Sequence, residues 1–260
     1  MADIETEHVL AGFVAAVRPV VPVLAVWAHG SLAMGDFQPG RSDLDLVAVI
    51  EAPLDGEQRD RLESIHRRLS ADEPAAAKLH CSYMVAAALD DAETAHVTWA
   101  HDMFLERPVT PVSRRELLSR GLVLHGPAPA ELIPPVSDRE LARYILRDLR
   151  EFWLPATGRA LRRLEEIWVD LGLPVAARAS VTLRDGRLIT KGEALAELTA
   201  LGAPADVVDD ICQRRYAADP PRPGRWRRVR RGLRARAFIR REIERILGSV
   251  RTGAPGLSSE

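Results

Sequence analysis

Two aspartates separated by one residue, Asp43 and Asp45, are the side chains best suited to chemistry in this chain. They stand directly before the apolar run 46–50, which has the length of a buried strand. Because side chains alternate between the two faces of a strand, Asp43 and Asp45 are expected to project together. Two neighbouring carboxylates repel unless a cation lies between them, and their hard oxygens suit Mg²⁺. We therefore predict that Asp43 and Asp45 are catalytic residues and Mg²⁺ ligands.

The dipeptide Gly30-Ser31 follows a second apolar run, residues 24–28, which also has the length of a buried strand. The chain is expected to turn here, and Ser31 to cap a short helix whose free N–H groups suit a phosphate. Gly30, Ser31 and Ser42 are the expected nucleotide-binding residues of this part of the chain. Beside the two aspartates, they predict a site for magnesium and a nucleoside triphosphate.

The order Gly-Ser, spacer, Asp-x-Asp at the start of a strand resembles the signature of the DNA polymerase β-like nucleotidyltransferases. The alternative is a loop with solvated acids. A later segment resembles the streptomycin/spectinomycin adenylyltransferases. The matching residues are Arg178, Thr182-Leu183, Gly186-Arg187 and Thr190-Lys191. The segment 213–216 is similar to that family's helix ending in a tyrosine. The resemblance covers most of residues 24–247.

The resemblance implies that Arg178, Lys191 and Tyr216 contact the phosphates of ATP from a helical domain. An Arg fork and a Lys point charge are suited to neutralising a triphosphate. Trp99 matches the tryptophan that would form an aromatic wall against the acceptor. The competing interpretation is that the cations belong to the surface and that Trp99 belongs to the core.

The sequence differs from these nucleotidyltransferases at the positions expected to activate and bind the acceptor. The resemblance calls for a third carboxylate on the third strand, and this chain has His80 there. A histidine can accept a proton near neutral pH, so His80 is the candidate base; Asp90, Asp91 and Glu93 lie just beyond it. Where the adenylyltransferases hold their cationic acceptor with acids, this chain has Leu164 and Trp168. The neighbouring acids are the candidate acceptor-binding residues: Glu165, Glu166 and Asp170.

Composition bounds the protein class. The 260 residues carry a formal net charge of −1 and are 47% hydrophobic, which fits a globular protein with no overall attraction to nucleic acid or membrane. No apolar run reaches membrane-spanning length, the first eight residues are acidic, and two distant cysteines suit a reduced compartment. We expect a cytoplasmic monomer. Residues 222–245 include eleven arginines, for which a solvated helix face is favoured over a nucleic-acid surface.

Periodicity and breakers predict an α+β protein with two domains. Residues 1–130 are expected to form the nucleotidyltransferase domain, a small mixed sheet with helices. Its predicted strands are 24–28, 46–50, 78–85 and 122–126, and its predicted helices are 5–17, 55–69, 94–104 and 113–119. Prolines cluster in residues 126–137, after which residues 131–250 read as an all-α bundle. Its predicted helices are 137–153, 158–171, 174–183, 190–201, 204–216 and 226–247. Residues 251–260 are expected to be a flexible tail.

Three functions are consistent with these features. The first is transfer of AMP from Mg²⁺–ATP to a hydroxyl of a small cationic acceptor such as an aminoglycoside. The second is the same transfer to a protein, a tRNA end or another metabolite. The third is a nucleotide-binding protein that lost its activity with the third carboxylate.

Overall fold

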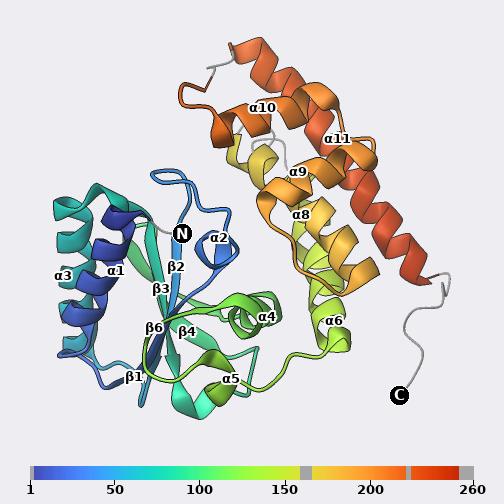
Figure 1. Cartoon of the computed structure of the whole chain (residues 1–260). Helices are drawn as coiled ribbons and strands as arrows, with labels where there is room; N and C mark the ends of the chain where they lie inside the picture. Colours follow the sequence, from blue (N-terminus) through green and yellow to red (C-terminus); the bar gives the residue numbers. More distant parts are fainter. Residues whose placement is uncertain (1–2, 159–165, 221–223, 252–260) are drawn as a thin grey trace. The chain divides into compact units, whose positions relative to one another are not determined.

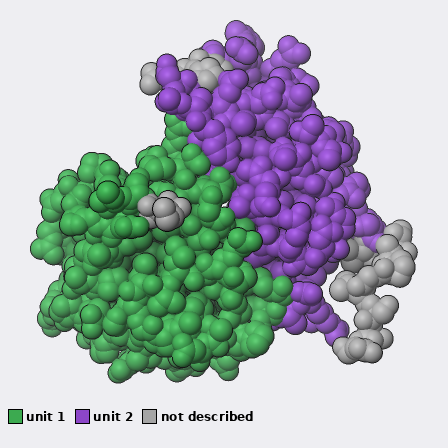
Figure 2. Space-filling view, viewed as in Figure 1, with its two compact units in different colours: residues 1–136 green, residues 137–260 purple. Residues whose placement is uncertain are grey.

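The structure is a computed structural model that describes residues 3–158, 166–220 and 224–251. The chain divides into two compact units, Met1–Val136 and Ser137–Glu260, which Figure 2 distinguishes by colour. The predicted α+β class is confirmed, because a mixed sheet occupies the first unit and helices make up the second. None of the described helices combines the length and apolar composition that a membrane crossing needs.

The first unit is built on a six-stranded sheet in the order β5-β4-β3-β2-β1-β6. Strands β2 and β3 are parallel, and the other neighbouring pairs are antiparallel. The strands are β1 Val23–Ala28, β2 Leu44–Ile50, β3 Leu79–Val85, β4 Ala95–Ala100, β5 Met103–Pro108 and β6 Leu122–His125. The parallel pair needs a crossover, which the helix between β2 and β3 supplies.

Helices cover both faces of this sheet (Figure 1). On one face, α1 (Ile4–Val17) and α3 (Gly56–Asp72) bury an apolar cluster that includes Phe13 and Leu62. On the other face, α4 (Pro111–Arg120) packs Leu117 against Trp27 and Val47. The short elements of this unit are α2 Gly30–Ala33, η1 Pro74–Lys78, η2 Ala86–Ala88 and α5 Pro129–Leu132. Two buried faces explain why β1 and β2 read as continuous apolar runs.

The prediction of a helix over residues 94–104 is wrong. This segment forms the hairpin of β4 and β5, which turns at His101 and Asp102 with φ values of 54° and 59°. Hairpin turns of this kind usually carry Gly or Asn. Because this turn has neither residue, the sequence gives no clear signal for a hairpin. Most of β4 is buried, and its side chains therefore lack the apolar-polar alternation that marks a half-exposed strand.

The second unit is helical. Its elements are α6 Asp138–Asp148, the π-helical turn η3 Leu149–Trp153, α7 Leu154–Ala156, α8 Glu166–Asp185, α9 Lys191–Ala200, α10 Ala205–Tyr216 and α11 Arg225–Arg251. The prediction of separate helices over 158–171 and 174–183 is wrong for the described residues, because α8 continues through Pro174. Proline removes one backbone hydrogen bond, but tertiary packing can retain the helix. Here Leu173 and Ala177 on either side of the proline are fully buried.

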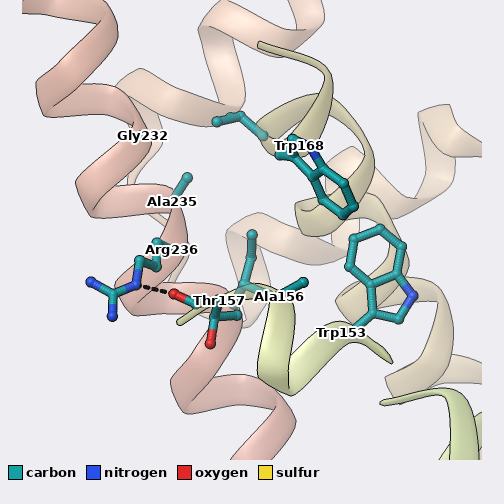
Figure 3. Close-up of a pocket in the computed structure, with 9 residues that line it drawn as sticks. Trp153, Ala156, Thr157, Trp168, Gly232, Ala235 and Arg236 are labelled. Atoms are coloured by element: carbon teal, nitrogen blue, oxygen red, sulfur yellow. Dashed lines mark hydrogen bonds between the residues drawn. The ribbon is translucent and has the colours of Figure 1, made fainter. Parts of the chain in front are cut away.

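Ion pairs and aromatic rings hold this unit together. Arg214 pairs with Asp170 of α8 and with Asp210 of its own helix, and Asp210 also pairs with Arg231 of α11. The rings of Trp153 and Trp168 lie 5.8 Å apart, in the lining of a cavity of about 40 Å³ (Figure 3). The charged residue of that lining, Arg236, donates to the Thr157 carbonyl oxygen (Figure 3). Apolar side chains make up most of the remaining cavity lining, so we interpret this cavity as a small gap in the packing of the helices.

Candidate functional site

The two aspartates lie at the start of β2. Asp43 directly precedes the strand, and Asp45 is its second residue. Leu44 and Leu46 are 1% and 2% exposed, whereas both aspartates are only partly buried. The alternation expected from the sequence is therefore present, with the leucines in the core and the aspartates on the opposite side.

Gly30 brings the end of β1 against Asp45. The His29 amide donates to the Asp45 carbonyl oxygen at 2.9 Å, and Gly30 then takes a φ of +64°. A Cβ atom at Gly30 would lie 2.6 Å from the Asp45 Oδ2 atom, a distance that real Cβ contacts do not reach. Only glycine allows both this backbone conformation and this approach.

The short helix α2 starts at Gly30, and its N-cap is His29. The expectation that Ser31 caps this helix is wrong, because Ser31 is already inside it. The side chain of His29 makes no capping hydrogen bond to the start of α2. Its first amides are consequently not covered by a cap, as a phosphate site at a helix start requires.

Ser42 has a structural role in the loop that joins α2 to β2. Its Oγ accepts a hydrogen bond from the Gln38 amide at 3.0 Å, and the residue is 8% exposed. The hydroxyl thus holds the loop that leads into Asp43. The nucleotide-binding role expected of Ser42 stays a prediction.

His80 lies beside Asp45. The two residues are direct partners in the parallel β2–β3 pairing, and the His80 Nδ1 atom is 3.7 Å from the Asp45 Oδ1 atom. The His80 ring also meets the ring of His101, from the β4–β5 turn, edge to face at 4.9 Å between centroids. The strand register therefore places an imidazole where the resemblance calls for a third carboxylate.

His29 is a neighbour of Asp45 that the sequence did not predict, and Glu116 is the hydrogen-bond partner of His29. The His29 Nδ1 atom donates to Glu116 Oε2 at 3.2 Å, and Glu116 is 6% exposed on α4. Burial disfavours the charged imidazole, but the hydrogen bond with Glu116 and the charge of Asp45 outweigh burial and raise the pKa of His29. The position of His29 directly before Gly-Ser was a usable sequence signal, whereas Glu116 is 87 residues away and gave none.

The charge of Asp45 is stabilised by its neighbours. Burial alone would raise the pKa of this carboxyl group, but the contact with His80 and the positive charges of His29 and Arg107 lower it below its ordinary value. A lowered pKa means that Asp45 is ionised at neutral pH, as a cation ligand must be.

The donor set at Asp43 and Asp45 fits Mg²⁺. Both residues offer carboxylate oxygens, and Mg²⁺ commonly takes one or two carboxylates together with substrate phosphates. Among the described residues, no group of three or more His, Cys, Asp or Glu side chains is arranged to hold a metal ion by itself. A magnesium ion here would therefore take part of its coordination from the substrate.

Trp99 is a core residue, and its assignment to the acceptor is corrected. It lies on β4, is 3% exposed, and stacks on the His66 ring of α3 at 4.8 Å between centroids. Its ladder partner Cys81 is fully buried. The ring therefore fills the α3 side of the sheet, opposite to the face that carries Asp45 and His80.

Two of the candidate phosphate-binding residues of the second unit, Arg178 and Lys191, lie near each other within that unit. Arg178 of α8 donates from Nε to the Ile189 carbonyl oxygen at 2.7 Å, two residues before Lys191. Lys191 is the first residue of α9, after the capping box of Thr190 and Glu193. Tyr216 ends α10, is 41% exposed, and carries the Arg215 guanidinium over its ring at 5.4 Å.

The three acidic residues predicted to bind the acceptor differ in what the structure shows of them. Glu165 lies outside the described residues, and Glu166 is the first residue of α8. Asp170 forms an ion pair with Arg214, so its charge is used in joining α8 to α10. This pairing argues against Asp170 as a free partner for a cationic acceptor.

Comparison with known proteins agrees with this geometry. Residues 11–89 match the family model described as a nucleotidyltransferase domain. No curated protein sequence is similar enough to be matched to the chain. The spectinomycin adenyltransferase AAD(9) of Enterococcus faecialis, whose crystal structure contains ATP and spectinomycin, has a similar fold, with a TM-score of 0.69 and 12% sequence identity over 91% of this chain and 98% of that one. Residues 11–89 are thus similar to a nucleotidyltransferase domain, and the chain shares its fold with this adenyltransferase.

Proposed function

We propose that this chain transfers AMP from Mg²⁺–ATP to a hydroxyl group of a small-molecule acceptor. The observation that carries the proposal is the approach of Gly30 to Asp45, which leaves no room for a side chain between the α2 turn and the carboxylate. A phosphate at that turn and a cation at Asp43 and Asp45 would then be direct neighbours.

The residues of the first unit divide the work of the reaction. Asp43 and Asp45 would hold Mg²⁺, which would supply positive charge to the triphosphate and to the transition state. Gly30 and Ser31 present their amides to phosphate oxygens. The acceptor oxygen forms a bond to the α-phosphorus, the bond from that phosphorus to the pyrophosphate oxygen breaks, and His80 accepts the hydroxyl proton.

Spectinomycin and streptomycin are the first acceptors to test, because the adenyltransferase of similar fold was crystallised with ATP and spectinomycin. The test measures pyrophosphate release from ATP with Mg²⁺ and each acceptor. Release that depends on an acceptor, with a mass increase of that acceptor by one adenylyl group, is the expected result.

Asp43→Asn and Asp45→Asn are expected to lower the transfer rate at least about 100-fold, because a neutral amide cannot hold the cation on which phosphoryl chemistry depends. Their melting temperatures should stay close to that of the wild type. Asp72→Asn, an exposed position at the end of α3, is the matched control and should keep full activity. Near wild-type turnover in both site variants would refute the assignment.

The imidazole at position 80 favours one alternative function, a nucleotide-binding protein without transfer activity. Binding of Mg²⁺–ATP without pyrophosphate release over a broad acceptor panel would support that alternative. In an active enzyme, His80→Gln should lower turnover while ATP affinity is retained, because the residue acts on the acceptor proton.

A further inference from the structure

Arg107 of β5 lies on the sheet face that carries Asp45 and His80, as the strand register shows. Asp45 pairs with His80 across β2 and β3, and Ser82 pairs with Thr98 across β3 and β4. His96, two residues before Thr98, pairs with Arg107 across β4 and β5. Paired residues, and residues two apart in a strand, share a face.

The neighbour of Arg107 confirms this orientation. Glu106 pairs with Arg59 of α3 at 3.1 Å, and α3 covers the opposite face of the sheet. Side chains alternate along a strand, so Arg107 points away from α3. Its positive charge acts on both Asp45 and His29.

The Arg107 guanidinium lacks an acceptor in the part of the chain that the structure describes. No carboxylate or carbonyl oxygen of those residues binds it, although the side chain is partly buried. The contrast is Arg114, whose guanidinium on α4 binds the carbonyl oxygens of Leu89, Val109 and Asp91. A partly buried guanidinium without a protein acceptor can give its N–H donors to an incoming anion.

We propose that Arg107 is a substrate-binding residue whose guanidinium binds a phosphate or carboxylate oxygen of a substrate beside Asp45. The planar guanidinium has two parallel N–H donors that match such groups. The inference relies on the proposed function for the identity of the substrates. The anion comes either from the triphosphate of ATP or from an acidic group on the acceptor.

Calorimetric titration with Mg²⁺–ATP distinguishes these sources. If the triphosphate is the anion, Arg107→Gln should weaken ATP binding at least about tenfold, the effect of a lost charge-assisted hydrogen bond. Arg107→Lys should lie between that variant and the wild type, since it keeps the charge and loses the fork. Arg59→Gln is the matched control, because it removes one positive charge that also contacts β5 but on the other face. It should bind ATP as the wild type does.

If the acceptor supplies the anion, Arg107→Gln should bind ATP normally, and its KM for the acceptor should rise at least about tenfold with kcat retained. Unchanged ATP affinity together with unchanged acceptor KM would overturn the inference. If the wild type binds ATP but transfers nothing, the proposed function fails. The ATP titration then tests the role of Arg107 by itself. Unchanged ATP affinity in Arg107→Gln would in that case overturn the inference. Circular dichroism melts of every variant establish that the changes are not caused by unfolding.

Discussion

Gly30 is the residue on which the geometry of the candidate site depends most directly. Its positive φ ends β1 in a turn, and its missing side chain lets that turn reach the Asp45 carboxylate. Position 30 thus requires glycine for two reasons, the positive φ of the backbone and the lack of space for a Cβ atom. A second glycine in the same region, Gly35, has only the first of them, because its φ is +77° and its Cβ position is open.

Gly30→Ala is therefore expected to abolish transfer, whereas Gly35→Ala should keep it. Both variants force alanine into a left-handed conformation, at a cost of about 1–2 kcal/mol in unfolding free energy. Only the Gly30 variant also pushes an atom against Asp45 Oδ2. Turnover and urea denaturation of the two proteins, measured side by side, separate the steric effect from the backbone strain. Equal activity in both variants would show that the close approach does not matter.

The sequence predicted those site residues whose signal is local. Asp43, Asp45, Gly30 and Ser31 lie within sixteen residues of one another, and their spacing alone indicated a shared site. Arg107 and Glu116 reach the same region only through the sheet register and the packing of α4. Neither relationship leaves a mark in one sequence, because partners far apart in the chain are selected by tertiary structure.

At the scale of elements, α3 and the sheet enclose a histidine in an apolar environment. His66 is 3% exposed, stacks on Trp99, and has its Nε2 atom 2.8 Å from the Tyr83 hydroxyl oxygen. Burial lowers the pKa of His66 to about 3. The folded protein therefore keeps this ring neutral over a range in which the unfolded chain protonates it.

Acidification is expected to destabilise the protein through His66. Between the ordinary histidine pKa of about 6.5 and the lowered value, the unfolded state binds more protons, so unfolding free energy falls as pH falls. From pH 7 to pH 5 the loss from this group is about 2 kcal/mol. Above pH 7 it contributes no pH dependence. His66→Phe keeps an aromatic ring against Trp99 and removes the titration, so urea denaturation at both pH values should show a smaller loss by about that amount. The same pH dependence in both proteins would contradict the assignment.

Most elements of the chain were predictable, and the exceptions have identifiable causes. Strands β1 and β2 were predictable because they are apolar runs bounded by turn residues, and β3 was predicted as well. The β4–β5 hairpin was missed because His101 and Asp102 make its turn without glycine. Pro174 predicts a helix boundary, but the buried residues around it keep α8 continuous. In both cases tertiary packing outweighed the local rule.

At the scale of the whole molecule, the second unit contributes candidate cations of its own. Lys191 is the first residue of α9, where a cation opposes the helix dipole and gains nothing from it. Arg178 donates to the loop that precedes Lys191. Both side chains carry positive charges of the kind that bind phosphate groups.

Lys191→Ala is expected to weaken Mg²⁺–ATP binding by about 1–3 kcal/mol, the range for a charge-assisted contact. Arg178→Ala should have an effect of similar size on ATP affinity. Arg240→Ala is the control, since Arg240 pairs with Glu244 on the exposed side of α11. Calorimetry that finds wild-type affinity in both variants would assign nucleotide binding to the first unit alone.

The pairing of β1 with β6 has a consequence for how the protein is made. Val26 pairs with His125, and the Trp27 indole donates to the Pro127 carbonyl oxygen at 2.8 Å, across 100 residues of chain. A ribosome that adds about 5–20 residues per second completes β6 about 5–20 seconds after β1. During that interval one side of β1 is an unpaired strand edge, to which another nascent chain can bind. Synthesis of the first unit therefore includes a period of several seconds in which aggregation competes with closure of the sheet.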